Sequence, residues 1–477
     1  MLKFLRPWLV IAAAAALVAC AGPQSSASRS AAESQTRLVL SDDGWSEITA
    51  SGLWETRPGL SRSADIRLSN TFDDHHLLVN TYRPGDLEEM SFEQMAERIN
   101  NGMLENIEAG RISPAQATTV GGRPAIAYEL RGKLGELELV YYSVMVDGQR
   151  ARYHLVGWAS AGGDSADVRQ LMAGFRESAK PRRAQQRVNL DFKWPSKLKA
   201  RATFKQKIVK RKGGYEMQGE MLMRVKPQGD DELVISTEVT RHNLKSGDKN
   251  KDKDFDAYLQ DVLRTLMADV PDYVVNRDGE FVRVTNLGEY HQRIQQSLIK
   301  GLPQGNPEAL AKAQEMVKAS LTEETLAVAL RSGWNEMVEL WVDGSYVPGH
   351  RYEFIQAYEA AALGEQEFPM PTTQQLVGSV PCRPNAAPTS CVRLRQESRV
   401  DGPEYTAAMD AYVQSKVGQG VRVKKMEVIN TLEVIADPRT LLPYFTHKKE
   451  IKRVTIEAEG KTTVNEDVED TEVSYRY

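Results

Sequence analysis

The segment LKARATFKQKI, residues 198–208, alternates apolar and polar side chains along most of its length. Successive side chains of a β-strand point to opposite faces of a sheet, so the alternation predicts a strand with Ala200, Ala202, Phe204 and Ile208 on one face. The alternation continues at residues 215–225 and 233–239. Three consecutive strands with one apolar face predict an antiparallel meander that packs on a core.

The opposite face of the first strand carries the cations Lys199, Arg201, Lys205 and Lys207. One interpretation is a surface for anionic lipid headgroups, to which each cation would contribute about 1 kcal/mol. The other is a solvated outer face, on which lysines also discourage edge-to-edge pairing of sheets. We favour the solvated face.

Further strand and helix patterns follow the meander. Asp278-Gly279 predicts a hairpin turn, and helical patterns follow at residues 287–298, 310–317 and 326–341. More strands are predicted at residues 351–357, 374–380, 392–397, 421–436 and, strongly polar, 448–477, with a short helix at 405–412. So long an antiparallel sheet must twist and curl. We therefore expect residues 188–477 to form a curved antiparallel β domain with a helical insert in its concave side.

The most regular helical pattern carries Trp334, Met337 and Trp341 on one face. Such a stripe either lines a lipid pocket or belongs to a core, and the core is the more common case. A helix-filled half-barrel resembles the LolA/LolB lipoprotein carriers, in which the concavity holds acyl chains. The resemblance implies a hydrophobic ligand and transfers no functional residue.

Residues 37–178 predict a separate, smaller unit. Short apolar stretches between turn residues suggest strands at 45–82, and Ser91 with Gln94 forms a capping-box pattern at the start of a helix. Gly121-Gly122 and Asp147-Gly148 indicate hairpin turns. A closing helix is predicted from the spacing of Val168, Leu171, Met172 and Phe175. This order predicts an α+β fold, an antiparallel sheet with helices against it.

The same unit resembles the PsbP/Mog-like family. The resemblance is carried by Val120-Gly121-Gly122-Arg123-Pro124-Ala125, the Asp147-Gly148 turn, the strand at Tyr153 and the closing helix ending at Phe175. It covers about 140 residues. It implies a PsbP-like α+β domain that serves in binding or assembly, and it transfers no catalytic residue.

The N-terminus predicts a lipid anchor. Lys3 and Arg6 precede an apolar run at residues 8–18, which is shorter than the roughly 20 residues of a membrane span and fits a signal peptide. Leu17-Val18-Ala19-Cys20 resembles the lipobox of bacterial lipoproteins. The resemblance implies a signal peptide at 1–19 and acyl chains on Cys20; the alternative is an ordinary signal peptide with a chance cysteine.

Position and composition add to this interpretation. The residue after Cys20 is Ala21 rather than Asp, which favours the outer membrane if the source is Gram-negative. Residues 20–36, rich in Ser and Ala, are expected to be a flexible tether, and residues 179–187 a linker between the units.

Two cysteines remain, Cys382 and Cys391, in a stretch rich in Pro. Outside the cytoplasm such a pair is expected to form a disulfide. Closing so short a loop contributes roughly 2.5–3 kcal/mol by chain entropy. A redox or metal pair is the alternative, but neither a CxxC spacing nor a nearby His supports it.

Nothing in the composition or motifs indicates nucleic acid, a cofactor or a metal. The 61 Lys and Arg balance 65 Asp and Glu, for a net charge of −4. Asp73-Asp74-His75-His76 is an improbable metal site, because adjacent strand residues point to opposite faces. Residues 248–254 resemble an EF-hand start but have Lys253 where glycine is needed and Leu259 where the final Glu is needed.

No GxSxG, HExxH, P-loop or GxGxxG motif is present. We therefore expect a non-enzymatic binding or assembly module on the periplasmic face of the outer membrane, with an envelope protein or a lipid as its ligand. The alternative is an envelope hydrolase acting on lipid or glycan through a carboxylate pair. A cleft with two facing acids and raised pKa values would favour the hydrolase; a closed apolar cavity would favour a carrier.

Replacing Cys20 by Ser removes the atom to which the lipid would be attached. We expect the Cys20→Ser protein to move from the membrane to the soluble fraction, because about two acyl chains suffice for stable anchoring and none would remain. Cell fractionation with immunoblotting checks this, and Ser26→Ala in the expected tether is the control. A Cys20→Ser protein that still sediments with membranes would contradict the anchor.

Overall fold

A computed structural model of the chain describes residues 36–477 except 62, 71–74, 85–89, 106, 135–136, 162–164, 179–185, 211–212, 247–266, 268–269, 301–310, 312–313, 315–321, 361–362, 364–365, 418–419 and 459. The signal peptide, Cys20, nearly all of the tether and the EF-hand-like residues lie outside the described residues. The described chain groups into two units. The larger contains Leu190–Val342 and Gln356–Tyr477, and the smaller contains residues 36–189 and Asp343–Ile355.

The smaller unit is built on an antiparallel sheet of order β3-β4-β5-β10-β9-β8-β6, with β7 beside β8. Its strands are β3 (Glu55–Thr56), β4 (Ile66–Asn70), β5 (His75–Tyr82), β6 (Glu108–Ile112), β7 (Gln116–Val120), β8 (Arg123–Leu134), β9 (Leu137–Asp147) and β10 (Arg152–Ser160). A second sheet of order β1-β2-β11 contains β1 (Thr36–Leu40), β2 (Ser46–Ser51) and β11 (Phe175–Glu177).

Two helices, α3 (Phe92–Glu105) and α4 (Ala166–Ala173), cover opposite faces of the larger of these sheets. Met145 of β9 packs with Met95 of α3, whereas its neighbours Val144 and Val146 belong to the core that contains the apolar residues of α4. The period of two along β9 therefore places one helix on each side. The α+β class with antiparallel sheets is confirmed.

The predicted start of α3 is confirmed and the predicted end of the last helix is wrong. Ser91 N donates to Gln94 Oε1 and Gln94 N donates to Ser91 Oγ, which is the reciprocal capping box. The last helix, α4, ends at Ala173, and Phe175 instead begins β11, paired with Ile48 of β2. Its helical spacing reflected burial, since Phe175 is 1% exposed, but the strand pairing determines its backbone.

Residues 343–355 cluster with the smaller unit, although their sequence position places them within the expected domain 188–477. Buried Arg67 explains this, because its guanidinium donates to the carbonyl of Ser345 at 3.1 Å and pairs with Asp42 at 2.6 Å. Glu55 accepts a hydrogen bond from the backbone of Ile355. These contacts are long-range, so no local pattern indicates them.

The larger unit is built on an 11-stranded antiparallel sheet of order β17-β16-β15-β14-β13-β24-β23-β22-β21-β20-β19, although the first residues of β19, up to Ile355, cluster with the smaller unit. Its strands are β13 (Leu198–Lys210), β14 (Gly213–Gln228), β15 (Glu232–Ser246), β16 (Tyr273–Asn276), β17 (Phe281–Val284), β19 (Arg351–Glu359), β20 (Glu367–Val380), β21 (Cys391–Val400), β22 (Val421–Ala436), β23 (Pro443–Ala458) and β24 (Lys461–Arg476). Pairing of β13 with β24 joins two meanders, so β17 and β19 lie at opposite edges.

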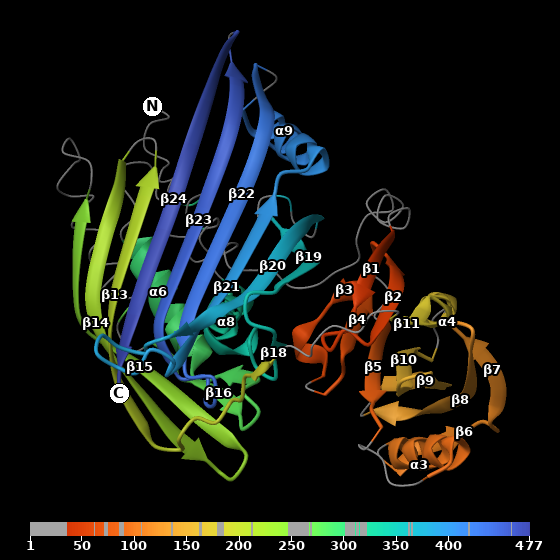
Figure 1. Cartoon of the computed structure of the whole chain (residues 1–477). Helices are drawn as coiled ribbons and strands as arrows, with labels where there is room; N and C mark the ends of the chain where they lie inside the picture. The colour runs from red at the N-terminus through yellow and green to blue at the C-terminus, as the bar shows by residue number, and fades with distance from the viewer. Residues whose placement is uncertain are drawn as a thin grey trace. The chain divides into compact units, whose positions relative to one another are not determined.

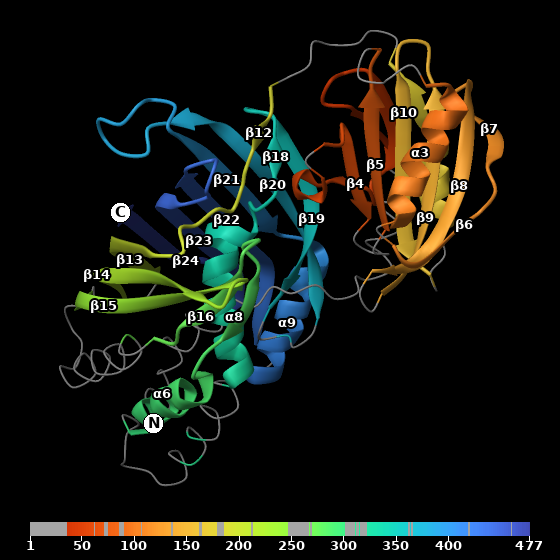
Figure 2. The same cartoon turned by 90° about the horizontal axis from the view of Figure 1, so that it is seen from below.

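The chain therefore crosses one face of the sheet between β17 and β19, and the helices of this connection lie on that face, within its curve (Figure 2). They are α6 (Leu287–Lys300) and α8 (Glu323–Trp334), followed by a π-helical turn at Asn335–Glu339. A further helix, α9 (Pro403–Val417), packs on β22. The helical pattern at 310–317 lies almost wholly outside the described residues.

We call the face covered by these helices the core face and the opposite one the outer face. Ala200, Ala202 and Ile208 are buried on the core face, as the alternation predicts. Trp334 is 1% exposed, stacks edge-on with neighbouring rings and donates its indole N–H to the carbonyl of Gly279 at 2.8 Å. Trp334 and Trp341 are thus core residues, which is the interpretation that we favoured.

None of the helices in the described part of the chain combines the length and the apolar character that crossing a bilayer requires.

Replacing Arg67 by Ala tests the attachment of residues 343–355. We expect a loss of about 3 kcal/mol in the free energy of unfolding, at the low end for a broken buried ion pair because Arg187 still pairs with Asp42. Urea unfolding measures it. Arg131→Ala, which removes an exposed ion pair with Glu129, is the matched control and should leave the midpoint unchanged. Equal urea midpoints for the two variants would show that the contacts of Arg67 do not stabilise the fold.

Candidate functional site

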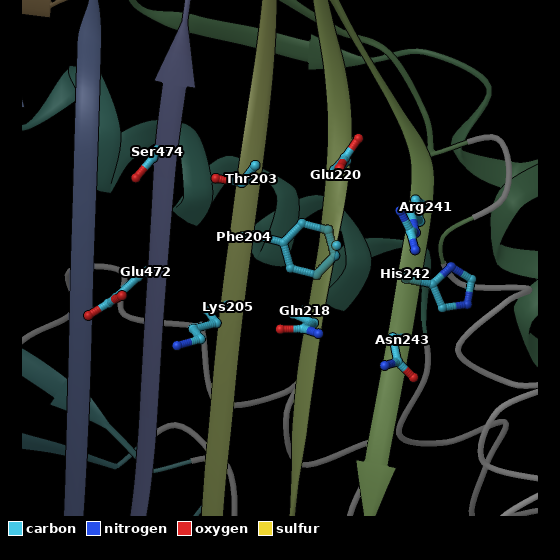
Figure 3. A pocket seen from close by; sticks show the side chains of 11 residues that line it. Thr203, Phe204, Lys205, Gln218, Glu220, Arg241, His242, Asn243, Glu472 and Ser474 are labelled. Atoms are coloured by element: carbon cyan, nitrogen blue, oxygen red, sulfur yellow. The ribbon is translucent and has the colours of Figure 1, made fainter. Parts of the chain in front are cut away.

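A polar groove crosses β24, β13, β14 and β15 on the outer face (Figure 3). Two rows of exposed side chains form its walls, because residues in register on adjacent antiparallel strands share a face. One row is Ser474, Thr203, Glu220 and Arg241, and the other is Glu472, Lys205, Gln218 and Asn243. The volume of about 460 Å³ lies within the range of ligand sites, about 300–1,000 Å³.

The row of residues between the two walls contributes the floor. Phe204, Gly219 and His242 are in register there, and their parity directs side chains to the core face. The Phe204 ring lies beside β14 (Figure 3), where a Cβ on Gly219 would come within 2.5 Å of its Cζ atom. A β-bulge between Glu220 and Met221 adds local twist at the same place. The bulge adds twist to the sheet at the groove, whereas Gly219 leaves room for the Phe204 ring on the core face.

Four charged groups in the groove have no side-chain partner among the described residues. Lys205, Arg241, Glu220 and Glu472 make no ion pair or side-chain hydrogen bond within the described residues. Some exposed charges elsewhere on this sheet are paired across strands, as in Arg224–Glu238 at 2.8 Å, Arg393–Glu433 at 3.5 Å and Lys424–Glu457 at 2.6 Å. The groove thus offers charges of both signs to a ligand.

The predicted row of cations on β13 does not form a uniformly positive surface. Lys207 lies in register between Glu216 on β14 and Asp470 on β24, and Lys205 lies beside Glu472. The other two cations of the row have basic neighbours, since Lys199 is in register with Arg224 and Arg201 with Arg476. The mixed charge around Lys205 and Lys207 opposes attraction of anionic lipid headgroups there and favours the solvated outer face.

A second polar group lies on the core face, where Glu450 of β23 stands opposite Glu469 of β24. Burial raises the pKa of Glu469 above its ordinary value, and the charge on Glu450 raises it further. Both carboxylates have partners: Lys452 Nζ lies 2.6 Å from Glu450, and Gln206 Nε2 donates to Glu469 at 2.8 Å. Two facing acids, one with a raised pKa, are the arrangement on which the hydrolase alternative depends.

The cysteine pair and the two adjacent histidines named in the sequence analysis make contacts that stabilise the fold. Cys382 and Cys391 form the expected disulfide, with Cα atoms 5.0 Å apart. His75 Nδ1 lies 2.8 Å from an Asp167 carboxylate oxygen, whereas the His76 ring packs on Trp158. The two histidines therefore have different neighbours, and the other half of their cluster, Asp73-Asp74, lies outside the described residues.

No model of a known protein family matches the chain. No curated protein matches it in sequence. A structure concerned with lipid–protein interactions in lipovitellin is similar over 60% of this chain, with 11% identity and a TM-score of 0.27; the chain spans about a quarter (25%) of that chain. A Bacteroides thetaiotaomicron structure is similar over 71% of this chain and 86% of its own, with 8% identity and a TM-score of 0.24. Scores this low transfer neither fold nor function.

Neither the groove nor the Glu450–Glu469 pair was identified from the sequence. A local signal exists for the Glu450–Glu469 pair. The turn at Gly460 sets the register of β23 on β24, so that Ala458 pairs with Lys461 and Glu450 with Glu469. The pairing of β13 with β24, which completes the groove, joins residues 259 to 275 positions apart, from Val209–Val468 to Arg201–Arg476. Local patterns carry no information about it.

Replacing Glu469 by Gln tests the raised pKa. A carboxyl whose pKa is higher in the folded state is protonated more readily there, so folding stability falls as pH rises from its ordinary pKa of 4.5 through the raised value. We expect Glu469→Gln to melt at a higher temperature than the wild type at pH 7.5 and at the same temperature at pH 4. Thermal unfolding at both values measures it.

Glu457→Gln on the same hairpin, whose carboxylate pairs with Lys424 on the surface, is the control and should show no pH-dependent gain. A lower melting temperature for Glu469→Gln at pH 7.5 would mean that Lys and Gln partners outweigh the cost of burial.

Proposed function

We propose that the chain is a non-enzymatic, lipid-anchored protein of the cell envelope whose larger unit binds a charged segment of a partner protein in the outer-face groove. The observation that carries this is a set of four charges in one hollow, Lys205, Arg241, Glu220 and Glu472, that have no side-chain partner among the described residues. Side chains exposed and unpaired in a concave site are available to a ligand without first breaking an internal bond.

The polar walls favour a polar partner over a hydrophobic one. Amides, hydroxyls and charges line the groove, whereas the aromatic ring of Phe204 points to the core face. On the core face, Trp334 and Trp341 are occupied by packing. A mixed-charge peptide segment matches such walls, because complementary charges orient a partner and select against wrong ones.

The anchor supports the same proposal. The lipobox at Leu17-Val18-Ala19-Cys20 would hold the protein on the periplasmic face of the outer membrane, where an envelope protein is the natural partner. The smaller unit, with helices on both faces of an antiparallel sheet, is consistent with a PsbP-like binding module. We propose that this unit is a PsbP-like binding domain.

The alternative function, an envelope hydrolase, is favoured by one observation, the facing Glu450 and Glu469 on the core face. Catalysis through such a pair requires carboxylates that are free to reach a substrate. Lys452 and Gln206 already engage them, so we rank binding first. Turnover of nitrophenyl esters or glycosides by the wild type, lost in Glu450→Gln, would reverse this order.

Photo-crosslinking in cells tests the groove. A photoreactive amino acid at Asn243, in the groove wall, should give a discrete adduct with an envelope protein, whereas the same residue at exposed Lys226 on β14 should not. Adding Arg241→Gln should reduce the adduct about tenfold, the equivalent of about 1.4 kcal/mol of binding. Immunoblotting measures the yield and mass spectrometry identifies the adduct.

Lys199→Gln is the control for Arg241→Gln, because Lys199 is a cation exposed on the same face of the sheet, on β13, but outside the groove. It should leave the Asn243 adduct unchanged. Equal adducts from Asn243 and Lys226, or a yield insensitive to Arg241→Gln, would refute binding in the groove.

A further inference from the structure

We infer that His447, Asp470 and Glu472 form a binding site for a divalent first-row transition metal at the edge of the groove. The site stands independently of the proposed partner. His447 of β23 is directly in register with Glu472 of β24, and Asp470 lies two residues before Glu472, on the same face. One ligand atom from each residue lies within 4.8 Å of the other two.

The distances suit a shared ion. His447 Nε2 and an Asp470 carboxylate oxygen are already 2.9 Å apart. Two ligands bound at about 2.0–2.2 Å to one ion are separated by roughly 3.0–3.5 Å, depending on geometry. Glu472 is exposed and has no hydrogen-bond or ion-pair partner in the described part of the chain, so its side chain can rotate the remaining distance.

The donor set selects the class of metal. An imidazole nitrogen favours zinc, copper or nickel over magnesium and calcium, which prefer oxygen alone. Three protein ligands leave at least one position for water or for a ligand atom, as in open metal sites. Because Glu472 also lines the groove, that open position lies at the groove's edge.

Nearby lysines limit the affinity. Lys205 is in register with Glu472, and Lys449 and Lys207 are in register with Asp470 on either side. Lys205 and Lys207 are exposed and Lys449 is half-buried, so solvent and salt weaken their repulsion of a cation. Removing one of these lysines should therefore strengthen metal binding, an effect opposite in sign to removing a ligand.

Calorimetric titration with zinc chloride tests the site. The protein is the full chain after the signal peptide, with Cys20→Ser so that no thiol outside the disulfide remains and with any histidine tag removed. We expect about one zinc ion per chain, binding at least about tenfold weaker in His447→Ala and in Glu472→Gln, and somewhat tighter in Lys205→Gln. Magnesium should give no comparable binding.

His242→Ala is the matched control, since His242 lies on β15 in the neighbouring groove but outside the trio, and its zinc affinity should equal that of the wild type. Equal melting temperatures would show that each variant is folded; Glu472→Gln, an exposed and isosteric change, supplies the decisive comparison. Absence of zinc binding by the wild type, or binding unchanged by both His447→Ala and Glu472→Gln, would overturn the site.

Discussion

The hydrogen bonding of β13 on both edges is the constraint on which the larger unit depends. Its residues pair with β14 along one side and with β24, the last strand of the chain, along the other. This places the ends of two meanders at opposite edges of one sheet, so the connection from β17 to β19 must cross a face. The crossing helices cover that face. The opposite face is exposed to solvent, carries charged side chains and contains the groove.

Local sequence patterns were sufficient for most individual elements. Period-two alternation predicted β13 to β15, the capping box of Ser91 and Gln94 predicted the start of α3, and Asp278-Gly279 predicted the β16–β17 hairpin. Phe175 was assigned wrongly because a buried aromatic at helical spacing is equally compatible with a strand that continues the same core. The burial of Phe175 was predicted correctly, whereas its backbone conformation is that of a strand and not of a helix.

Functional residues were harder to predict because they depend on pairings between distant segments. The disulfide joins two cysteines nine residues apart and could be expected from the sequence. The groove and the trio of His447, Asp470 and Glu472 need the register of β24 against two neighbours at once. The scattered histidines of the sequence therefore suggested no metal site, although the turn at Gly460 was enough to place His447 opposite Glu472.

The inclusion of residues 343–355 in the smaller unit has a consequence for the order of synthesis. The polypeptide passes between the two units after Asn189, after Val342 and after Ile355. Domains of many proteins fold one after another as the chain emerges. Here Arg67 bonds to the carbonyl of Ser345 and β13 pairs with β24, so neither unit can be complete before those later segments have been synthesised.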